Sequence, residues 1–143
     1  MSVSFFSNRI KFKLVNKSKI IKWLERTAKT ENAVITELNY IFCSDHYLHK
    51  INVDFLRHDT FTDIITFDFC PPKASGDPKN IVGEIYISIK RVEENARQFN
   101  CSFENELHRV IIHGLLHLCG YKDKTKSEAS LMRKKEDFYI GQI

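Results

Sequence analysis

The sequence SFENELHRVIIHGLLHLCG, residues 102–120, places apolar side chains on most of the circumference of the helix that it predicts. At about 100° per residue, two apolar stripes form, and a third side carries His113 and His117. The first stripe consists of Leu107, Ile111, Leu115 and Leu118. The second stripe consists of Ile112, Leu116 and Cys119. Such a helix belongs in the interior, so the rest of the chain must supply layers that cover it. A chain of 143 residues suffices for one domain with one substantial core.

The other segments predict strands and helices in an irregular order. Strands are expected at residues 3–6, 33–43, 62–69 and 81–89, and helices at 16–30, 44–56, 90–100 and from Thr125 onward. In the second strand, Val34, Leu38, Tyr40 and Phe42 are expected on one buried face, and Phe99 is expected to face inward. Because regular βαβ alternation is missing, we predict an α+β fold. Residues 1–143 would form a single small domain, with a mixed sheet of about four strands and a helical layer that carries the H-x-x-x-H helix.

The composition predicts a soluble protein. Hydrophobic residues make up 43% and charged residues 28% of the chain, and no run approaches the roughly 18 apolar residues of a membrane span. The first residues lack the pattern of a signal peptide, so we expect a cytoplasmic protein. The four cysteines form no C-x-x-C pair and are expected to remain thiols there. A loop at residues 70–80, which holds all three prolines, is a candidate flap over a site.

Positive charge is concentrated at the N-terminus. Residues 1–30 contain eight Lys or Arg residues against one acid, Glu25, a local charge of +7 in a chain of net charge +4. Such a concentration attracts phosphates and points to nucleic acid. The alternative is the solvated, lysine-rich face of an amphipathic helix. The eight basic residues are Arg9, Lys11, Lys13, Lys17, Lys19, Lys22, Arg26 and Lys29.

His113 and His117 are four residues apart, so a helix projects both imidazole rings from one face. Both rings can then reach one metal ion, as in H-x-x-x-H sites. Gly120 and Tyr121 can end the helix and turn the chain back, which would bring Asp123 to the same ion. Two histidines, a carboxylate and one open position make a catalytic zinc site. The alternatives are two hydrogen-bonded core histidines and an exposed aspartate between two lysines.

Gly114 occupies the position that holds the general base in H-E-x-x-H metalloproteases, which argues against a peptidase. A glycine inside a helix costs about 1 kcal/mol relative to alanine. Its presence indicates either the close approach of a substrate to the bare backbone or a tight helix–strand crossing. Glu106, two turns earlier, lies on roughly the same side as the histidines and is a candidate neighbour of the site or a helix-surface residue.

Three blocks of the sequence resemble the YbeY family of bacterial endoribonucleases that mature ribosomal RNA. Residues 113–121, HGLLHLCGY, are similar to its H-G-x-L-H-L-x-G-Y-D-H signature. Residues 48–69 and 82–88 are similar to its L-N-x-x-Y-R-x-x-D-x-P-T-D-V-L-S-F and L-G-D-I-x-I-S blocks. Asp123 replaces the family's third histidine ligand, and Phe61 replaces its proline. An aspartate keeps a zinc ligand but makes the centre less positive, so activity or metal preference is expected to differ.

The resemblance implies a single-strand-specific, metal-dependent endoribonuclease that acts at the 3′ end of small-subunit ribosomal RNA and in ribosome quality control. It implies one zinc ion per chain, held by His113, His117 and Asp123. Arg57 would bind phosphate and act with the two histidines in catalysis, while Thr62 and Asp63 would shape the floor of the cleft. The basic N-terminal residues and the lysines at positions 122, 124 and 126 would add a salt-sensitive hold on RNA.

The same resemblance implies ribosomal RNA and the small ribosomal subunit as partners, with the protein a monomer or a weak oligomer that does not enter a membrane. Two other functions stay open. One is a ribosome-associated RNA-binding protein whose metal is structural, favoured by Asp123 and by the absence of a glutamate after His113. The other is a metal-dependent hydrolase of a different substrate, since a metal-activated water can attack esters and amides as well.

Overall fold

The structure is a computed structural model that describes residues 2–70 and 76–143. The strands are β1 (Ser2–Ser7), β2 (Ala33–Cys43), β3 (Ile64–Asp68) and β4 (Lys79–Ser88). The helices are α1 (Lys17–Thr30), α2 (Asp45–Leu56), α3 (Ile89–Gln98), α4 (Phe103–Leu118) and α5 (Lys126–Ile140). Residues 71–75 of the loop that is expected to form a flap, residues 70–80, lie outside the described residues.

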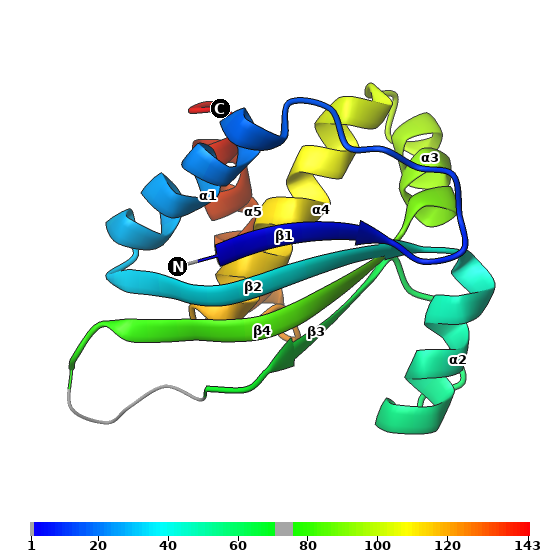
Figure 1. Ribbon diagram of the computed structural model, residues 1–143, viewed down its shortest axis with the longest axis horizontal. Coiled ribbons are helices and arrows are strands. Elements are labelled where there is room, and N and C mark those ends of the chain that lie inside the picture. Colours follow the sequence, from blue (N-terminus) through cyan, green and yellow to red (C-terminus); the bar gives the residue numbers. More distant parts are fainter. Residues whose placement is uncertain (1, 71–75) are drawn as a thin grey trace.

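The four strands form one mixed sheet in the order β1-β2-β4-β3 (Figure 1). The pairs β1–β2 and β2–β4 are parallel, and β3 runs antiparallel to β4 at the edge of the sheet. The predicted α+β fold, with a mixed four-stranded sheet in a single small domain, is therefore confirmed. The one regular βαβ unit is β1-α1-β2, whose two strands lie side by side.

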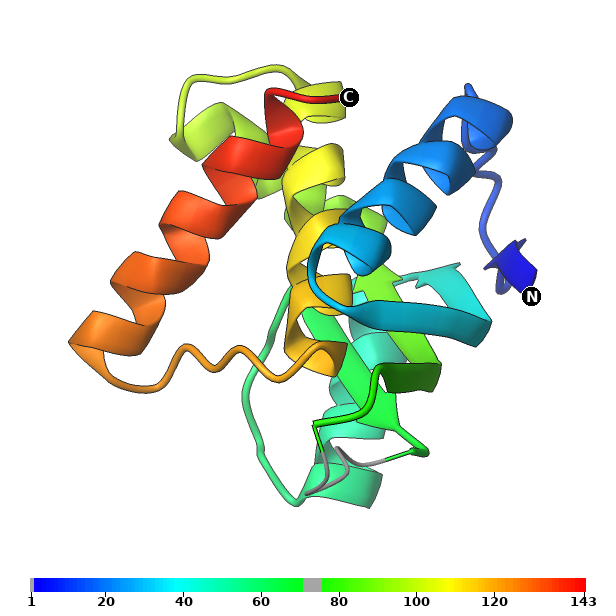
Figure 2. The ribbon, with the colours of Figure 1, turned by 90° about the vertical axis from the view of Figure 1, so that its left-hand side faces the viewer.

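The helix α4 occupies the middle of the helical layer, as its apolar circumference predicted (Figure 2). Its buried side chains join α1, the sheet and α5 in one core, which contains Trp23, Tyr40, Ile85, Leu115 and Tyr139. A second, smaller cluster forms where α2 packs near β3 and β4, around Cys43, Leu48, Ile51 and Ile65. Among the described residues, no helix combines the length and the apolar character that crossing a bilayer requires.

Gly114 marks a tight crossing between α4 and the sheet. A Cβ atom at this position would lie 2.8 Å from Cδ1 of Ile85 and 3.1 Å from Cδ1 of Ile64. Close helix–strand packing is thus the alternative that the structure supports, because these side chains of β4 and β3 fill the space beside the bare backbone. The close approach fixes the depth at which the histidine helix sits on the sheet.

A bulge in β2 overturns the prediction that Val34 shares a buried face with Leu38. Ile35 pairs with Ile81 and Glu37 with Val82, so one extra residue is inserted into β2. An inserted residue reverses the alternation of side chains beyond it. As a result Ile35 is 2% exposed and Val34 is 49% exposed, while Leu38 is fully buried.

The helix ends follow local side-chain chemistry in most cases. Ser44, Ser88 and Ser102 each accept a hydrogen bond from a backbone N–H in the first turn of the following helix. Thr125 forms the predicted capping box with Glu128 at the start of α5.

The inward orientation predicted for Phe99 is wrong, because this side chain is 58% exposed.

Candidate metal centre

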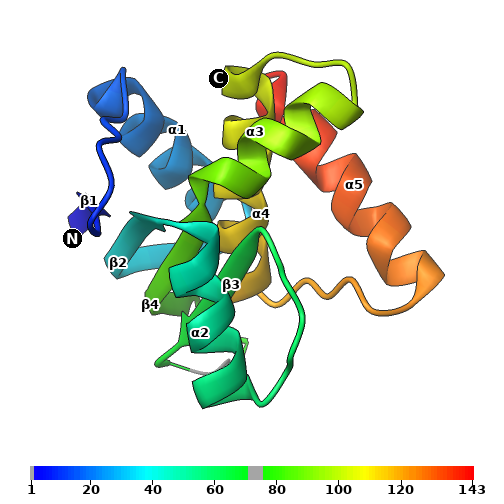
Figure 3. The ribbon, with the colours of Figure 1, turned by 90° about the vertical axis from the view of Figure 1, so that its right-hand side faces the viewer.

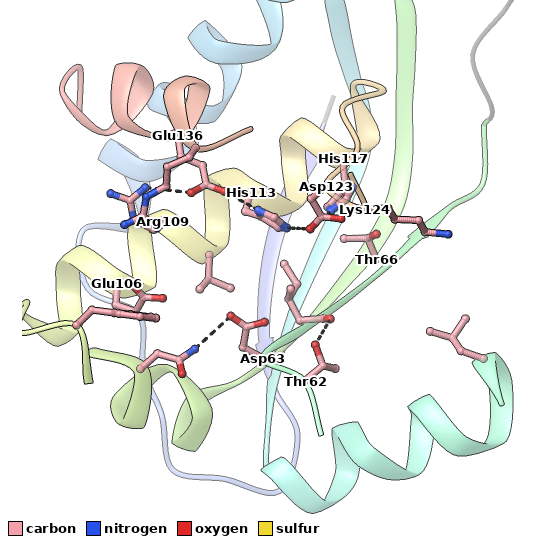
Figure 4. A pocket seen from close by; sticks show the side chains of 16 residues that line it. Thr62, Asp63, Thr66, Glu106, Arg109, His113, His117, Asp123, Lys124 and Glu136 are labelled. Atoms are coloured by element: carbon pink, nitrogen blue, oxygen red, sulfur yellow. Dashed lines mark hydrogen bonds and ion pairs between the residues drawn. The ribbon is translucent and has the colours of Figure 1, made fainter. Parts of the chain in front are cut away.

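Three side chains converge at the C-terminal end of α4 (Figure 4). His113 and His117 project from successive turns of the helix, and Asp123 projects from the loop that follows it. Oδ2 of Asp123 lies 3.3 Å from Nε2 of His113 and 3.4 Å from Nε2 of His117. In a tetrahedral zinc site with bonds of about 2.0 to 2.1 Å, the ligand atoms stand about 3.3 to 3.4 Å apart. Both distances from Asp123 therefore fit one zinc ion, and all three donor atoms lie within 4.8 Å of one another.

The loop that carries Asp123 is shaped by Gly120. Its φ of 112° lies in a region that side chains with a Cβ rarely adopt. The N–H of Gly120 donates to the carbonyl of His117 at 3.0 Å, and that of Tyr121 donates to the carbonyl of Leu116 at 3.1 Å. These two bonds make a Schellman motif, which ends α4 and turns the chain back toward the histidines.

Tyr121 anchors this loop to the rest of the fold. Its hydroxyl donates to Oε1 of Glu31, the residue that ends α1, at 2.6 Å. The same carboxylate accepts hydrogen bonds from the Tyr139 hydroxyl and, at 3.3 Å, from Nζ of Lys135, both on α5. Burial would raise the pKa of Glu31, but these hydrogen bonds and the charge of Lys135 outweigh it and lower the pKa. One carboxylate thus joins α1, α5 and the ligand-bearing loop.

Glu136 on α5 orients the first histidine. Its Oε2 lies 2.6 Å from Nδ1 of His113. Since an ionised carboxylate only accepts, Nδ1 carries the proton, and Nε2 is directed at Asp123. Oε1 of Glu136 in turn accepts a hydrogen bond from Arg109 at 3.0 Å, and Arg109 also pairs with Asp137 at 2.8 Å. A carboxylate behind a ligating histidine is the usual arrangement in metal sites, since it fixes the orientation of the ring.

The two histidines have different electrostatic surroundings. Burial opposes protonation of His113, but the hydrogen bond and charge of Glu136 and the charge of Asp123 outweigh it, so its pKa is raised. Burial and the neighbouring His113 lower the pKa of His117, and Asp123 opposes this only in part. His113 therefore has the more negative surroundings of the two rings, because Glu136 on α5 contacts it.

The three ligand candidates lie in the wall of a cleft of about 660 Å³ between α4, α5, α3 and the segment before β3 (Figure 4). Thr62 and Asp63, which we expected at its floor, do line it, and so does Glu106. Burial raises the pKa of Asp63, an effect that the charge of His113 partly offsets. The cationic side chains that line the cleft are Arg109, Lys124 and Arg133.

Arg57 is not brought to the metal-ligand candidates. It is an exposed residue at the end of α2 with a φ of 56°, and it is absent from the lining of the cleft. Its neighbour in the sequence, Leu56, does line the cleft. The alternative to phosphate binding is a surface salt bridge of Arg57 with Asp54 or Asp59. Neither pair forms in the described part of the chain, where Asp59 pairs with His49 at 2.8 Å.

The sequence reasoning missed Glu136, Arg109 and Glu31. A detectable signal existed for Glu136, since it lies four residues after Met132 and three before Tyr139 on the buried face of α5. The apolar pattern of the sequence predicts a last helix through Leu131, Met132 and Phe138, but of these only Met132 is buried, and Leu131 and Phe138 are 47% and 55% exposed. A glutamate within an apolar helical stripe must have a buried partner. The fold and the site thus define a small α+β protein with a His–His–Asp group that could hold a metal ion in the wall of a cleft.

Comparison with known proteins identifies the family. A family model described as Endoribonuclease YbeY matches residues 3–143. A Flavobacterium johnsoniae protein of that name is 50% identical over 138 residues, which are 96% of this chain and 95% of the relative. One from Cytophaga hutchinsonii is 50% identical over 136 residues, 95% and 92% of the two chains. A Thermotoga maritima protein of known solution structure matches with a TM-score of 0.63 and 30% identity, over 97% and 87%. This chain belongs to the YbeY family.

Proposed function

We propose that this protein is a metal-dependent endoribonuclease that cleaves single-stranded RNA. The observation that carries the proposal is the convergence of His113, His117 and Asp123, whose donor atoms lie within 4.8 Å of one another in the wall of a cleft with cationic side chains. The names of the relatives, which are endoribonucleases, support the choice of RNA as the substrate. In this account residues 1–143 form one catalytic domain.

The three ligands would hold one zinc ion per chain. A zinc ion bound there supplies a Lewis acid for a phosphoryl oxygen and acidifies a water molecule. His113 is held by Glu136, so its Nε2 stays directed into the cleft while substrate enters. Asp63 projects into the cleft from the β3 side (Figure 4), where its carboxylate is placed to accept a proton during attack on phosphorus.

Cations at the cleft would hold the RNA backbone. Lys124 and Arg133 line it and form no ion pair with a carboxylate of the described residues, so both are available for phosphate. Arg109 is committed to Glu136 and Asp137. Arg57, which follows the cleft-lining Leu56 in the sequence, would bind the next phosphate of the RNA strand. This contact keeps its proposed catalytic role as a phosphate clamp. The exposed ring of Phe99 would stack on an unpaired base, a contact that a duplex does not offer.

The biological setting of this activity follows from the family resemblance. We place the protein in the cytoplasm, as a monomer or weak oligomer, on ribosomal RNA and the small ribosomal subunit. Its reactions would be maturation of the 3′ end of small-subunit RNA and removal of defective ribosomes. The net charge of +4 is compatible with an RNA partner, because attraction to the phosphate backbone increases with positive charge.

A second candidate function is RNA binding with a structural metal. The observation that favours it is Asp123, an anionic ligand where the family signature has a histidine, because the centre it forms is less positive. This candidate predicts that metal removal lowers the melting temperature sharply, while cleavage of RNA by the intact protein stays at background. A third candidate, hydrolysis of a different substrate, predicts turnover of small esters or peptides in place of RNA.

The test compares two histidine variants on one RNA. His113→Ala removes a ligand candidate, and His46→Ala makes the same chemical change at an exposed position on α2 outside the cleft. The substrate is an RNA with the 3′ end of small-subunit ribosomal RNA as a single strand, with a duplex of the same sequence alongside. We expect cleavage of the single strand by the wild type and His46→Ala, and none by His113→Ala. Full cleavage by a metal-free His113→Ala protein would refute the proposal.

A further inference from the structure

The eight basic residues of the N-terminal segment, residues 9–29, are all exposed. None of them forms an ion pair with a carboxylate among the residues that the structure describes. Elsewhere among the described residues, Lys79, Arg91, Arg109 and Lys135 each pair with an acid, whereas scattered lysines such as Lys50, Lys90 and Lys134 form no ion pair either. The N-terminal cations differ in their concentration, because residues 1–30 hold eight of them against one acid. Arg26 donates a hydrogen bond to the carbonyl of Gln142 at 3.3 Å, but no carboxylate of the described residues neutralises any of the eight charges, so their counterions are available for release.

Four of these residues form one outer ridge on α1, consisting of Lys19, Lys22, Arg26 and Lys29. At about 100° per residue they fall within a sector of about 80°, on the side of the helix opposite Ile20 and Leu24, which are buried in the core. With a rise of about 1.5 Å per residue, the ridge is about 15 Å long. The four charges therefore lie along one side of the helix.

The stability of α1 does not explain this arrangement. Lys17 and Lys19 lie in the first turn, which contains no acidic residue, and Asn16 makes no side-chain cap. Cations at a helix N-terminus oppose the helix dipole, and only Lys29 lies in the last turn, where a cation is favourable. Among the ridge residues the dipole favours Lys29, opposes Lys19 and leaves Lys22 and Arg26 unaffected, so it does not account for the clustering of all four.

The outer ridge lies away from the cleft. In the two opposite views of Figures 2 and 3, α1 stands on one side of α4, and α5, which closes the cleft, stands on the other. None of the four ridge residues lines the cleft. An RNA engaged by the ridge would thus touch a surface separate from the one that holds the scissile phosphate.

We propose that the outer ridge of α1 is a second RNA-binding surface, which holds the sugar–phosphate backbone of RNA beyond the segment in the cleft. The inference rests on the proposed function for its choice of RNA among polyanions. Closely spaced, unpaired lysines without accompanying apolar or aromatic side chains suit a phosphate backbone, and they predict binding that ignores sequence. The ridge would raise the affinity for long, structured RNA and leave short single strands to the cleft alone.

The test neutralises three ridge lysines and, separately, three matched lysines. The ridge variant is Lys19→Gln/Lys22→Gln/Lys29→Gln, and the control is Lys50→Gln/Lys90→Gln/Lys134→Gln. All six side chains are exposed and make no hydrogen bond or ion pair with residues 2–70 or 76–143, and both triple variants change net charge equally. Binding of a hairpin RNA with a single-stranded 3′ extension is measured by fluorescence anisotropy at several salt concentrations, in a His113→Ala background so that the RNA stays intact.

Each phosphate contact contributes about 0.7 to 0.9 to the slope of log Kd against log salt, so loss of three contacts reduces the slope by about 2 to 3. Between about 50 and 200 mM salt, the parent should therefore lose about 20- to 40-fold more affinity than the ridge variant. The control variant should retain the slope of the parent, and a short single strand should bind all three proteins alike.

Equal slopes for the ridge and control variants would overturn the proposal, since net charge alone would then explain the effect. A second measurement compares the binding of the same proteins to vesicles that contain phosphatidylglycerol. If the ridge variant lost vesicle binding while its RNA binding stayed unchanged, the proposal would be overturned, and the ridge would be assigned to an anionic membrane. Because the readout is binding, failure of the wild type to cleave RNA would refute the proposed function without affecting this result.

Discussion

Replacing Glu136 with glutamine separates its role at the metal centre from its role in the fold. The side chain of Glu136 is 6% exposed and holds His113 at 2.6 Å and Arg109 at 3.0 Å. Glutamine keeps the length and one acceptor oxygen but removes the charge that strengthens both contacts. We expect weaker metal binding, because a neutral partner makes the imidazole a poorer ligand and fixes its ring less firmly.

The magnitude follows from these contacts. Loss of a hydrogen-bonding partner behind a ligating histidine costs about 10- to 100-fold in metal affinity, or about 1.4 to 2.7 kcal/mol. The free energy of unfolding should fall by about 1.5 to 3 kcal/mol, the range for a hydrogen bond to a charged group. It should not reach the larger loss expected for an unpaired buried cation, because Arg109 keeps Asp137 at 2.8 Å.

The matched control is Asp137→Asn, which removes the same charge from the same arginine. Asp137 is 58% exposed and does not touch His113, so we expect metal affinity to be retained and at most about 1 kcal/mol of stability to be lost. Metal affinity is measured by competition with a chromogenic chelator, and stability by urea unfolding. Equal losses of metal affinity in the two variants would refute the reasoning, since only overall charge would then matter.

Three further predictions follow from single positions. Gly114→Ala should destabilise the fold by about 1 to 2 kcal/mol in urea unfolding, because its Cβ would lie 2.8 Å from Ile85; Gly141→Ala, with its nearest contact at 3.5 Å, should be tolerated. The lowered pKa of Glu31 contributes stability that is present above the unfolded-state pKa and is lost as pH falls through the folded-state pKa. Glu31→Gln should therefore be less stable at neutral pH and lose less stability on acidification, as melting temperatures against pH would show. Asp63→Asn should bind metal normally but cleave RNA at least about 100-fold more slowly in single-turnover assays; unchanged cleavage would exclude it as the proton acceptor.

Most elements of the fold could be predicted because local and global signals agree in them. The apolar circumference of α4 predicted an interior helix, and the structure buries Ile111, Ile112 and Leu115 completely. Thr125 and Glu128 predicted the start of α5, since a capping box satisfies backbone groups with side chains close in sequence. The convergence of two histidines four residues apart is likewise a local property of a helix.

The remaining features depend on contacts between distant segments. The bulge in β2 is set by pairing with β4, so alternation within the strand alone misplaced Val34. Glu136 is separated from His113 by 23 residues, and Glu31 from Tyr121 by 90, so neither pairing could be read from spacing. Gly114 admitted two interpretations until the side chains of the sheet were placed beside it. The sequence contained the chemical groups of the site, and the tertiary fold decided which of them meet.

The central claim is that His113, His117 and Asp123 together bind one metal ion. It is tested most directly by metal content, measured by mass spectrometry on untagged protein purified without chelators. The comparison includes Asp123→Ala and, as a control, Asp54→Ala at an exposed position on α2. We predict about one zinc ion per chain in the wild type and in Asp54→Ala, and its loss in Asp123→Ala. Zinc retained in full by Asp123→Ala, or absent from the wild type, would contradict the claim.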